Sequence, residues 1–142
     1  MKTRIFITAI FLSIISLFPS CTRNNGDIGE LFGLWQVTSV TIDDNEHPEY
    51  DGVLYFAFQS SVFSQRLVNE VTHVDDYTFA SWKYQGEDII IDFSDPDYLP
   101  FGFTGMQQGQ NLIHIPEIKD GNMTMHFIDN EGTEYRYRLK KW

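Results

Sequence analysis

The feature that most constrains the fold is a succession of eight short segments, rich in β-branched and aromatic residues and separated by turn-forming residues. The predicted strands span residues 34–42, 53–59, 62–69, 77–84, 87–94, 111–117, 122–129 and 133–142. Beyond residue 20, no stretch has a sustained helical period. The sequence therefore predicts an all-β domain, built as an antiparallel barrel or as a sandwich.

The turns between these strands predict a register, because opposed residues of a hairpin share a face of the sheet. A two-residue turn at 85–86 predicts the pairs Trp82–Ile89, Ala80–Ile91 and Thr78–Phe93. Three-residue loops at 119–121 and 130–132, with Gly121 and Gly132 in the left-handed conformation, align the apolar residues of the last three strands. The expected pairs are Ile115–Met125, Ile113–Phe127, Phe127–Tyr135, Met125–Tyr137 and Met123–Leu139.

The loop lengths alternate along the chain and decide between the two architectures. Loops 43–52, 70–76 and 95–110 are long, whereas the connections between them are tight turns, and 130–132 is a short exception. In an up-and-down barrel, successive loops fall at opposite ends, so one end is closed by hairpins and the other is surrounded by long loops. A Greek-key sandwich would not sort its loops in this way. We therefore expect an eight-stranded antiparallel up-and-down barrel.

Gly33-Leu34-Trp35 opens the first predicted strand, and "SWKYQGEDIII" combines a tryptophan strand, a glycine turn and an aliphatic strand. With eight strands, these motifs resemble the Gly-x-Trp signature of lipocalins, or calycins, and above all the small lipocalin-like lipoproteins of Bacteroidetes. The resemblance implies a calycin-type barrel over residues 33–142. Trp35 is then a structural plug at the closed end, where Arg138, or alternatively Arg136, covers the indole in a cation–π contact.

The interior of such a barrel either fills with its own side chains or holds one small ligand. The inward-facing candidates in the strands include Val37 and Ile113. Loop 95–110 carries Tyr98 and Leu99 with three further large apolar residues, so we expect it to fold over the mouth as a lid that bends at Gly102 and Gly105. The candidate ligand-binding residues are Phe56, Phe58, Trp82, Ile91, Phe93, Phe101, Phe103, Met106, Met125, Phe127, Tyr135 and Tyr137.

The loops at the open end carry acidic residues and no lysine or arginine. The acidic residues are Asp43, Asp44, Glu46, Glu49, Asp51, Glu70, Asp75, Asp76, Asp95, Asp97 and Glu131. Their field repels a fatty acid and favours a neutral or cationic ligand or a basic surface on a partner. The same residues would also serve as a solvated face that keeps the barrel soluble.

Two of these loops pair a histidine with a carboxylate, as His47-x-Glu49 and His73-x-Asp75. These ligand types suit zinc, but their spacing matches no named motif, so we expect no metal site. The sequence has no nucleophile elbow, no zinc-protease motif and no phosphate-binding glycine loop. We therefore expect neither enzymatic activity nor a cofactor.

The N-terminus has the pattern of an export signal, with Lys2 and Arg4 before an apolar run that ends at Phe18. "LFPSC" ends in Cys21, the only cysteine, and resembles the relaxed lipobox of Bacteroidetes, in which the cysteine is acylated. The resemblance implies a signal peptide at 1–20, a lipidated tether at 21–32 and a barrel domain at 33–142. The alternative is an incidental free thiol. Without residues 1–20, eight basic residues face twenty acidic ones, a formal net charge of −12 that disfavours nucleic acid as a partner.

Two functions remain open. The protein is either a membrane-anchored lipocalin-like lipoprotein that binds a small hydrophobic, neutral or cationic ligand in its barrel, or a non-catalytic interaction module that docks an envelope protein through its acidic rim. We expect an outer-membrane lipoprotein that faces the periplasm, because no acidic run directly follows Cys21. The tether leads to the closed end, so the mouth is expected to point away from the membrane.

Overall fold

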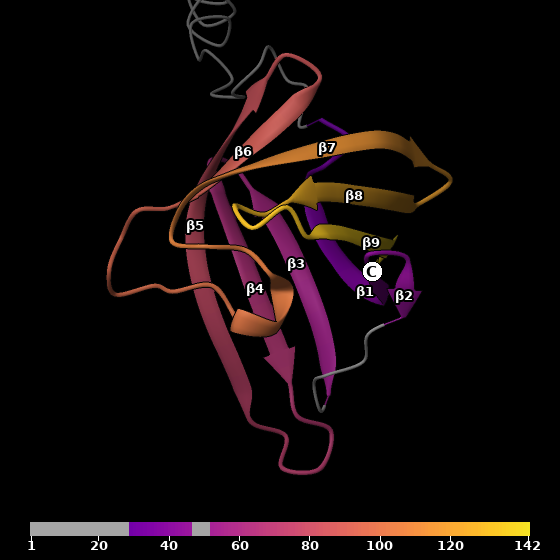
Figure 1. Ribbon diagram of the computed structural model, residues 1–142. Helices are drawn as coiled ribbons and strands as arrows, with labels where there is room; N and C mark the ends of the chain where they lie inside the picture. The colour runs from indigo at the N-terminus through magenta and orange to yellow at the C-terminus, as the bar shows by residue number, and fades with distance from the viewer. Residues whose placement is uncertain (1–28, 47–51) are drawn as a thin grey trace, which may run out of the picture.

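The computed structural model describes residues 29–46 and 52–142 (Figure 1). The long strands are β1 (Gly33–Ile42), β3 (Val53–Gln59), β4 (Val62–Val68), β5 (Asp75–Gln85), β6 (Asp88–Phe93), β7 (Gly109–Lys119), β8 (Asn122–Ile128) and β9 (Glu134–Lys141). A short strand, β2 (Asn45–Glu46), and a 3-10 turn, η1 (Gly102–Thr104), are the other elements within these ranges. No helix in the described part of the chain is long and apolar enough to cross a membrane.

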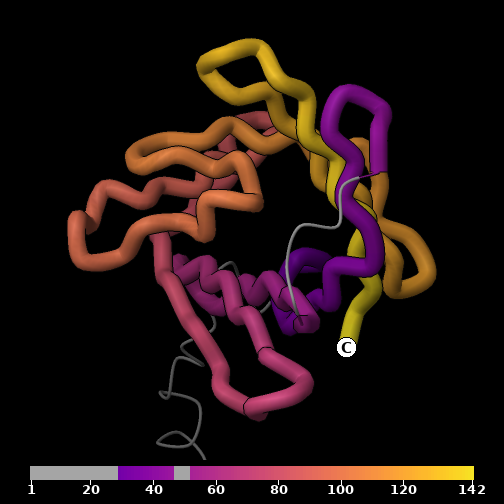
Figure 2. Tube along the Cα trace, turned by 60° about the horizontal axis from the view of Figure 1, so that its bottom comes forward, coloured from indigo at the N-terminus to yellow at the C-terminus, as the bar shows by residue number. Residues whose placement is uncertain are grey.

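The eight long strands form a closed barrel. Each pairs with its neighbour in an antiparallel manner, and β1 pairs with β9 from Trp35–Lys141 to Ile42–Tyr135, which closes the sheet (Figures 1 and 2). The predicted up-and-down barrel is confirmed. The small hairpin of β2 against the end of β1 was not predicted. It turns at Asp43 and Asp44, which both have positive φ, as a type I′ turn requires.

The connections whose residues are described sort between the two ends of the barrel as their lengths predicted, while residues 47–51 of the predicted long loop 43–52 lie outside the described residues. Two-residue turns at 60–61, 86–87 and 120–121 lie at one end, with the segment 29–32. The β4–β5 and β6–β7 connections lie at the other end with the short β8–β9 loop. We call the first the closed end and the second the mouth.

The register of β8 and β9 is as predicted, whereas that of β5 and β6 differs by two residues. Met123 opposes Leu139, and the two further predicted pairs of this hairpin also hold. Trp82, in contrast, opposes Ile91 instead of Ile89, because the tight turn is formed by Gly86 and Glu87. A shift of two residues keeps every side chain on its predicted face, so the interior keeps its apolar lining.

The β7–β8 turn is also tighter than predicted. Asp120 and Gly121 form a two-residue turn with φ values of 51° and 73°, in place of a three-residue loop. The pairing nevertheless returns to the predicted register at His114, which opposes His126. An irregularity between His114 and Glu117 absorbs the extra residue.

The core is one cluster of aromatic and aliphatic side chains inside the barrel. Phe63 lies at its centre, with ring centroids 5.3 Å from Phe56 and 5.1 Å from Phe58, and Phe56 lies 5.4 Å from Tyr137. The eleven residues predicted to face inward all belong to this cluster or pack against it. They are Val37, Phe56, Phe58, Trp82, Ile91, Phe93, Ile113, Met125, Phe127, Tyr135 and Tyr137.

Trp35 is fully buried at the closed end, and its indole N–H donates to the carbonyl of Leu31 at 2.8 Å. The cation above the indole is Lys141, with Nζ 5.2 Å from the ring centroid. The expectation of Arg138 or Arg136 was wrong, because the register of β1 and β9 places Lys141 directly opposite Trp35. Arg138 is exposed on the outer face.

Candidate functional site

The β6–β7 connection covers the mouth of the barrel, as expected of a lid. We call residues 94–108 the lid loop, which turns toward the barrel axis through η1 (Figure 2). Met106 is 4% exposed, and the stacked rings of Phe101 and Phe103 are half-buried against the core. Tyr98 and Leu99 remain exposed. The lid loop therefore contributes side chains to the interior at one end and to the surface at the other.

Gln65 of β4 holds the lid loop from inside the barrel. Its side chain is fully buried, and its Oε1 accepts a hydrogen bond from the backbone amide of Phe101 at 2.8 Å. Its Nε2 lies 3.3 Å from Thr104 Oγ1 and 3.2 Å from Met106 Sδ. The hydroxyl of Tyr137 donates to the carbonyl of Thr104. Two side chains of the barrel wall thus bind the backbone of the lid loop.

Gly105 brings the backbone of the lid loop against Tyr135. It has a φ of 68°, and a Cβ at this position would lie 2.2 Å from the tyrosine ring. The ring stacks in turn on Phe127, with centroids 4.9 Å apart. Burial, followed by the nearby carboxylates of Asp129, Glu131 and Asp43, raises the pKa of Tyr135. Gly102 and Gly105 were both expected to let the loop bend. Only Gly105 is required for the contact with Tyr135, because a Cβ there would overlap the ring.

The second half of the lid loop is fixed to β7. Asn111, which is 7% exposed, donates from Nδ2 to the carbonyls of Gln107 and Gly109 at 2.8 and 3.1 Å. Its Oδ1 accepts from the amide of Gln107 at 2.8 Å. These bonds restrain residues 107–109, so any opening of the lid is expected to move the part that precedes Gln107.

The interior beneath the lid loop also contains polar atoms. Thr78 opposes Gln65 in the β4–β5 register and is 3% exposed, and its hydroxyl has no hydrogen-bond partner among the described residues. Buried polar groups are normally hydrogen-bonded. Gln65 and Thr78 are therefore opposed polar side chains in a mainly apolar interior, and Gln65 and Tyr137 both bind Thr104, an arrangement of few polar groups that is typical of ligand sites.

All twelve candidate ligand-binding residues contribute to one hydrophobic cluster. Phe56, Phe58, Ile91, Phe93, Met106, Met125, Phe127 and Tyr137 are buried in it, and Trp82, Phe101, Phe103 and Tyr135 pack against it. Sequence reasoning missed Gln65, Thr104 and Phe63. The alternation of Phe63, Gln65 and Leu67 in one strand was a signal for two of them, because it places a glutamine on an inward face.

The acidic rim is partly neutralised by arginines that reach into it from the strands. Arg66 Nη2 lies 2.6 Å from Asp75 Oδ2, and Arg136 Nη1 lies 3.2 Å from Asp44 Oδ1. Glu49 and Asp51 lie outside the described residues. The mouth therefore has a negative border with two internal ion pairs.

Of the four residues weighed for a metal, His47 and Glu49 lie outside the described residues. Within residues 29–46 and 52–142, no group of three or more histidine, cysteine, aspartate or glutamate side chains is placed to hold a metal ion. The strand histidines lie beside carboxylates, with His114 Nδ1 2.6 Å from Asp88 and His126 Nε2 2.9 Å from Glu134.

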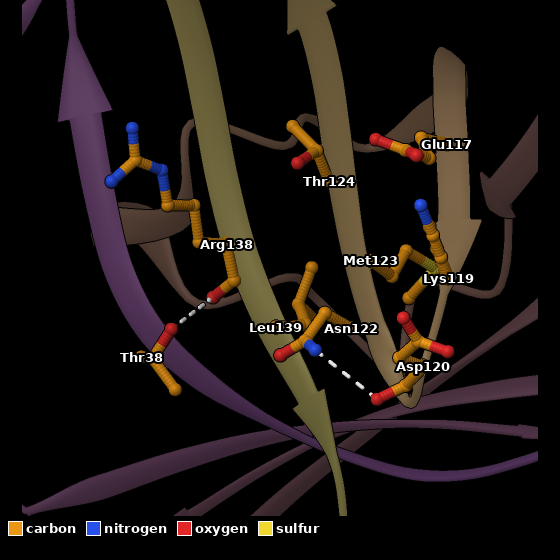
Figure 3. Close-up of a pocket in the computed structure, with 9 residues that line it drawn as sticks. All are labelled: Thr38, Glu117, Lys119, Asp120, Asn122, Met123, Thr124, Arg138 and Leu139. Atoms are coloured by element: carbon orange, nitrogen blue, oxygen red, sulfur yellow. Dashed lines mark hydrogen bonds between the residues drawn. The ribbon is translucent and has the colours of Figure 1, made fainter.

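A surface pocket of about 480 Å³ lies outside the barrel, on β1, β7, β8 and β9 (Figure 3). Arg138 and Lys119 contribute positive charge to it, and Glu117 and Asp120 contribute negative charge. Thr38 Oγ1 donates to the backbone carbonyl of Arg138 at 3.0 Å. Because both signs of charge border this pocket, it favours no single class of ligand.

The sequence matches no family model and no curated protein. Among solved structures, a lipocalin-like protein from Bacteroides uniformis is similar with a TM-score of 0.59 and 19% identity, over 80% of this chain and 100% of that chain. An uncharacterized protein from Bacteroides eggerthii gives a TM-score of 0.58 and 18% identity, over 79% and 99%. Bovine odorant-binding protein complexed with its natural ligand gives 0.47 and 14%, over 87% and 77%. The fold is that of a lipocalin-like barrel.

Proposed function

We propose that this protein is a non-catalytic lipocalin-like lipoprotein of the cell envelope that binds a small apolar molecule, neutral or cationic, beneath its lid loop. One observation carries the proposal. Gln65 and Thr78 face each other across β4 and β5 in a mainly aromatic and aliphatic interior, and Gln65 and Tyr137 both bind Thr104 of the loop above. A few convergent polar groups within an apolar enclosure are typical of sites that orient a small ligand.

In this proposal the lid loop occupies the site when no ligand is bound. A ligand displaces the lid loop and takes over the hydrogen bonds that Gln65 and Tyr137 make to it. Each such bond contributes about 0.5–1.5 kcal/mol, and burial of Met106 contributes about 1.5–3 kcal/mol. Opening the lid therefore costs roughly 3–6 kcal/mol, which lowers the apparent affinity about tenfold for each 1.4 kcal/mol.

The experiment is a titration of the purified domain with a neutral lipophilic dye, followed by fluorescence. We expect saturable binding, and weaker binding by the Phe101→Ser/Phe103→Ser variant at little cost in stability, because the two rings are apolar contacts for a ligand at the mouth. Leu99→Ser is the matched control, since Leu99 lies in the same loop and is 56% exposed. Absence of dye uptake by both the parent protein and the lid variant would remove ligand binding from the proposal.

Anchoring and orientation are part of the same proposal. Cys21 is acylated, and the segment that follows it reaches the barrel at Leu31, which lies beneath Trp35 at the closed end. Lys140 and Lys141 end β9 near this point, and positive residues there favour a membrane with anionic lipids. The mouth then opens toward the periplasm. Cys21→Ser should release the domain from the membrane fraction, and acyl labelling that persists in this variant would refute the anchor.

The dense interior favours docking of an envelope protein as the second candidate function. Phe56, Phe58 and Phe63 already fill the barrel centre, with ring centroids 5.1 to 5.3 Å apart. A barrel that remains filled has only its surface to offer a partner. The dye titration separates the two functions, because docking alone predicts no uptake in either the parent or the lid variant.

A further inference from the structure

The outer face of β3, β4 and β5 carries a continuous series of aromatic rings that the core does not use. Trp142 meets the ring of Tyr55 edge-on at 5.6 Å, and Phe79 follows Tyr77 with nearly parallel rings 6.2 Å apart. Phe79 in turn meets Tyr98 of the lid loop edge-on at 5.4 Å. We call these five residues the aromatic strip.

The β-sheet register explains why these rings line up. Arg66 of β4 pairs with Tyr55 of β3 on one side and with Tyr77 of β5 on the other. Two residues earlier in β4, Ser64 pairs with Phe79 of β5. The guanidinium of Arg66 lies 5.7 Å from the Tyr55 ring centroid and 5.6 Å from that of Tyr77. Arg66 thereby joins the two tyrosines into one surface through cation–π contacts.

The aromatic strip is unusually exposed for the outer face of a sheet, which is normally polar where it meets water. Tyr77 is 49% exposed, Phe79 39%, Tyr98 41% and Trp142 76%. Contiguous exposed apolar surface of this kind marks interaction sites. The tryptophan and tyrosines of the strip, together with the adjacent Arg66, are of the residue types that dominate binding energy at protein interfaces.

Tyr77 and the adjacent Arg66 are held in place by Asp75 before any partner arrives. Asp75 accepts hydrogen bonds at one carboxylate oxygen from Arg66 Nη2 at 2.6 Å, from Arg66 Nε at 3.0 Å and from the Tyr77 hydroxyl at 3.1 Å. The hydrogen bond to Asp75 also raises the pKa of Arg66, so the cation persists. Side chains that are already ordered lose less freedom on binding, which favours association.

Charge identifies the kind of partner. Asp95 and Asp97 lie beside Tyr98 in the lid loop, and Asp75 already neutralises Arg66, so the strip has a negative border at its Tyr98 end. At this end a second copy of the chain would bring a like-charged border, and a membrane with anionic lipids would be repelled, whereas Lys140 and Lys141 precede Trp142 at the other end of the strip. We propose that the aromatic strip docks a protein that presents an apolar centre bordered by lysine or arginine. The strip faces outward, so this inference stands whether or not the interior binds a ligand.

The test uses the lipidated protein in phosphatidylcholine discs and two synthetic peptides with the same aromatic centre, one flanked by lysines and the other by glutamates. We expect the tryptophan fluorescence of the protein to change on binding of the lysine peptide and not with the glutamate peptide, with an affinity that falls as salt rises. Tyr77→Ser/Phe79→Ser should weaken this binding about tenfold or more. Leu112→Ser is the matched control, because Leu112 is 51% exposed on β7 and should leave the affinity unchanged.

Three results would overturn the inference. The first is that the parent protein binds both peptides with equal affinity, or binds neither peptide. The second is an equal loss of binding in the Leu112→Ser control. The third is that the parent protein self-associates, or binds phosphatidylglycerol vesicles, and that the strip variant loses this association but keeps its affinity for the lysine peptide. Tyr77 contacts Phe79 and Asp75, whereas it is Phe79 that meets Tyr98 of the lid loop, so dye uptake by the interior should be the same in the parent and in Tyr77→Ser alone, which separates this inference from the proposed ligand site.

Discussion

The side-chain oxygen of Gln65 accepts a hydrogen bond from the backbone amide of Phe101, so a residue inside the barrel holds the main chain of the loop above it. The same side chain meets Thr104 and Met106, on either side of Gly105. The position of the lid loop thus depends on the buried side-chain amide of Gln65. Replacing this side chain should loosen the lid loop more than it destabilises the strands of the barrel.

Replacing Gln65 by leucine leaves the amide of Phe101 without its acceptor, at nearly constant side-chain volume. We expect the free energy of unfolding to fall by about 1–3 kcal/mol and the amide of Phe101 to exchange its hydrogen faster. Urea denaturation and hydrogen exchange measure the two effects. Gln110→Leu, which removes an exposed bond to Asp92 of 3.2 Å, is the control and should change stability by less than about 0.5 kcal/mol. Unchanged exchange at Phe101 in Gln65→Leu would contradict the anchoring role.

Gly105→Ala should be more destabilising than the same change at Gly132. Both glycines have positive φ, which costs a side chain about 1–2 kcal/mol. Only at Gly105 does the added methyl group also meet the ring of Tyr135, whereas nothing lies within 4 Å of it at Gly132. Thermal unfolding of both variants measures the difference, and Tyr135→Ala should recover part of the loss at Gly105. Equal melting temperatures for the two alanine variants would mean that the lid backbone does not rest on Tyr135.

Lys141→Met tests which cation covers Trp35. Removal of the ammonium group should lower the free energy of unfolding by about 0.5–2 kcal/mol and alter the tryptophan emission. Arg138→Met is the control, since Arg138 opposes Ser39 and lies on the outer face. Chemical denaturation with fluorescence detection measures both variants. A larger loss of stability in Arg138→Met than in Lys141→Met would support Arg138 as the cation that covers Trp35.

Tyr135 should make stability depend on alkaline pH. Its pKa is raised in the folded state, chiefly by burial, so its contribution is fully present below the unfolded pKa of about 10 and is lost as the pH rises through the folded pKa. Melting temperatures measured between pH 8 and about 11 should therefore fall less steeply in Tyr135→Phe than in the parent protein. Parallel curves for the two proteins would show that the hydroxyl titrates as if it were in water.

Sequence patterns predicted the strands, their faces and the closed barrel, because alternation and turn residues act locally. The β8–β9 register followed from its loop, where Gly132 has the expected positive φ of 88°. The β5–β6 register did not, since a glycine at position 86 suits either place in a two-residue turn. The shift by two residues changed the partners of Trp82 and left its face unchanged.

The contacts that the sequence could not predict are those made between distant segments. Lys141 was missed as the cation over Trp35 because a register irregularity between Val37 and Ser39 decides which residue of β9 lies there. The role of Gln65 depends on Phe101, which reaches it only through the path of the lid loop. The strand pattern does place Gln65 on an inward face, but it does not say what the amide meets.

Closure of the barrel by β1 and β9 has a consequence for when the protein can fold. Trp35 meets Lys141 across this seam, so the two ends of the domain must find each other before the sheet is complete. Contacts between residues so far apart in the chain form slowly, because the intervening chain loses entropy before the contact stabilises it. We therefore expect folding in milliseconds to seconds after the last strand emerges, not during synthesis. For the proposed exported lipoprotein, the chain would then reach the export machinery still unfolded, in the state that can be threaded across a membrane.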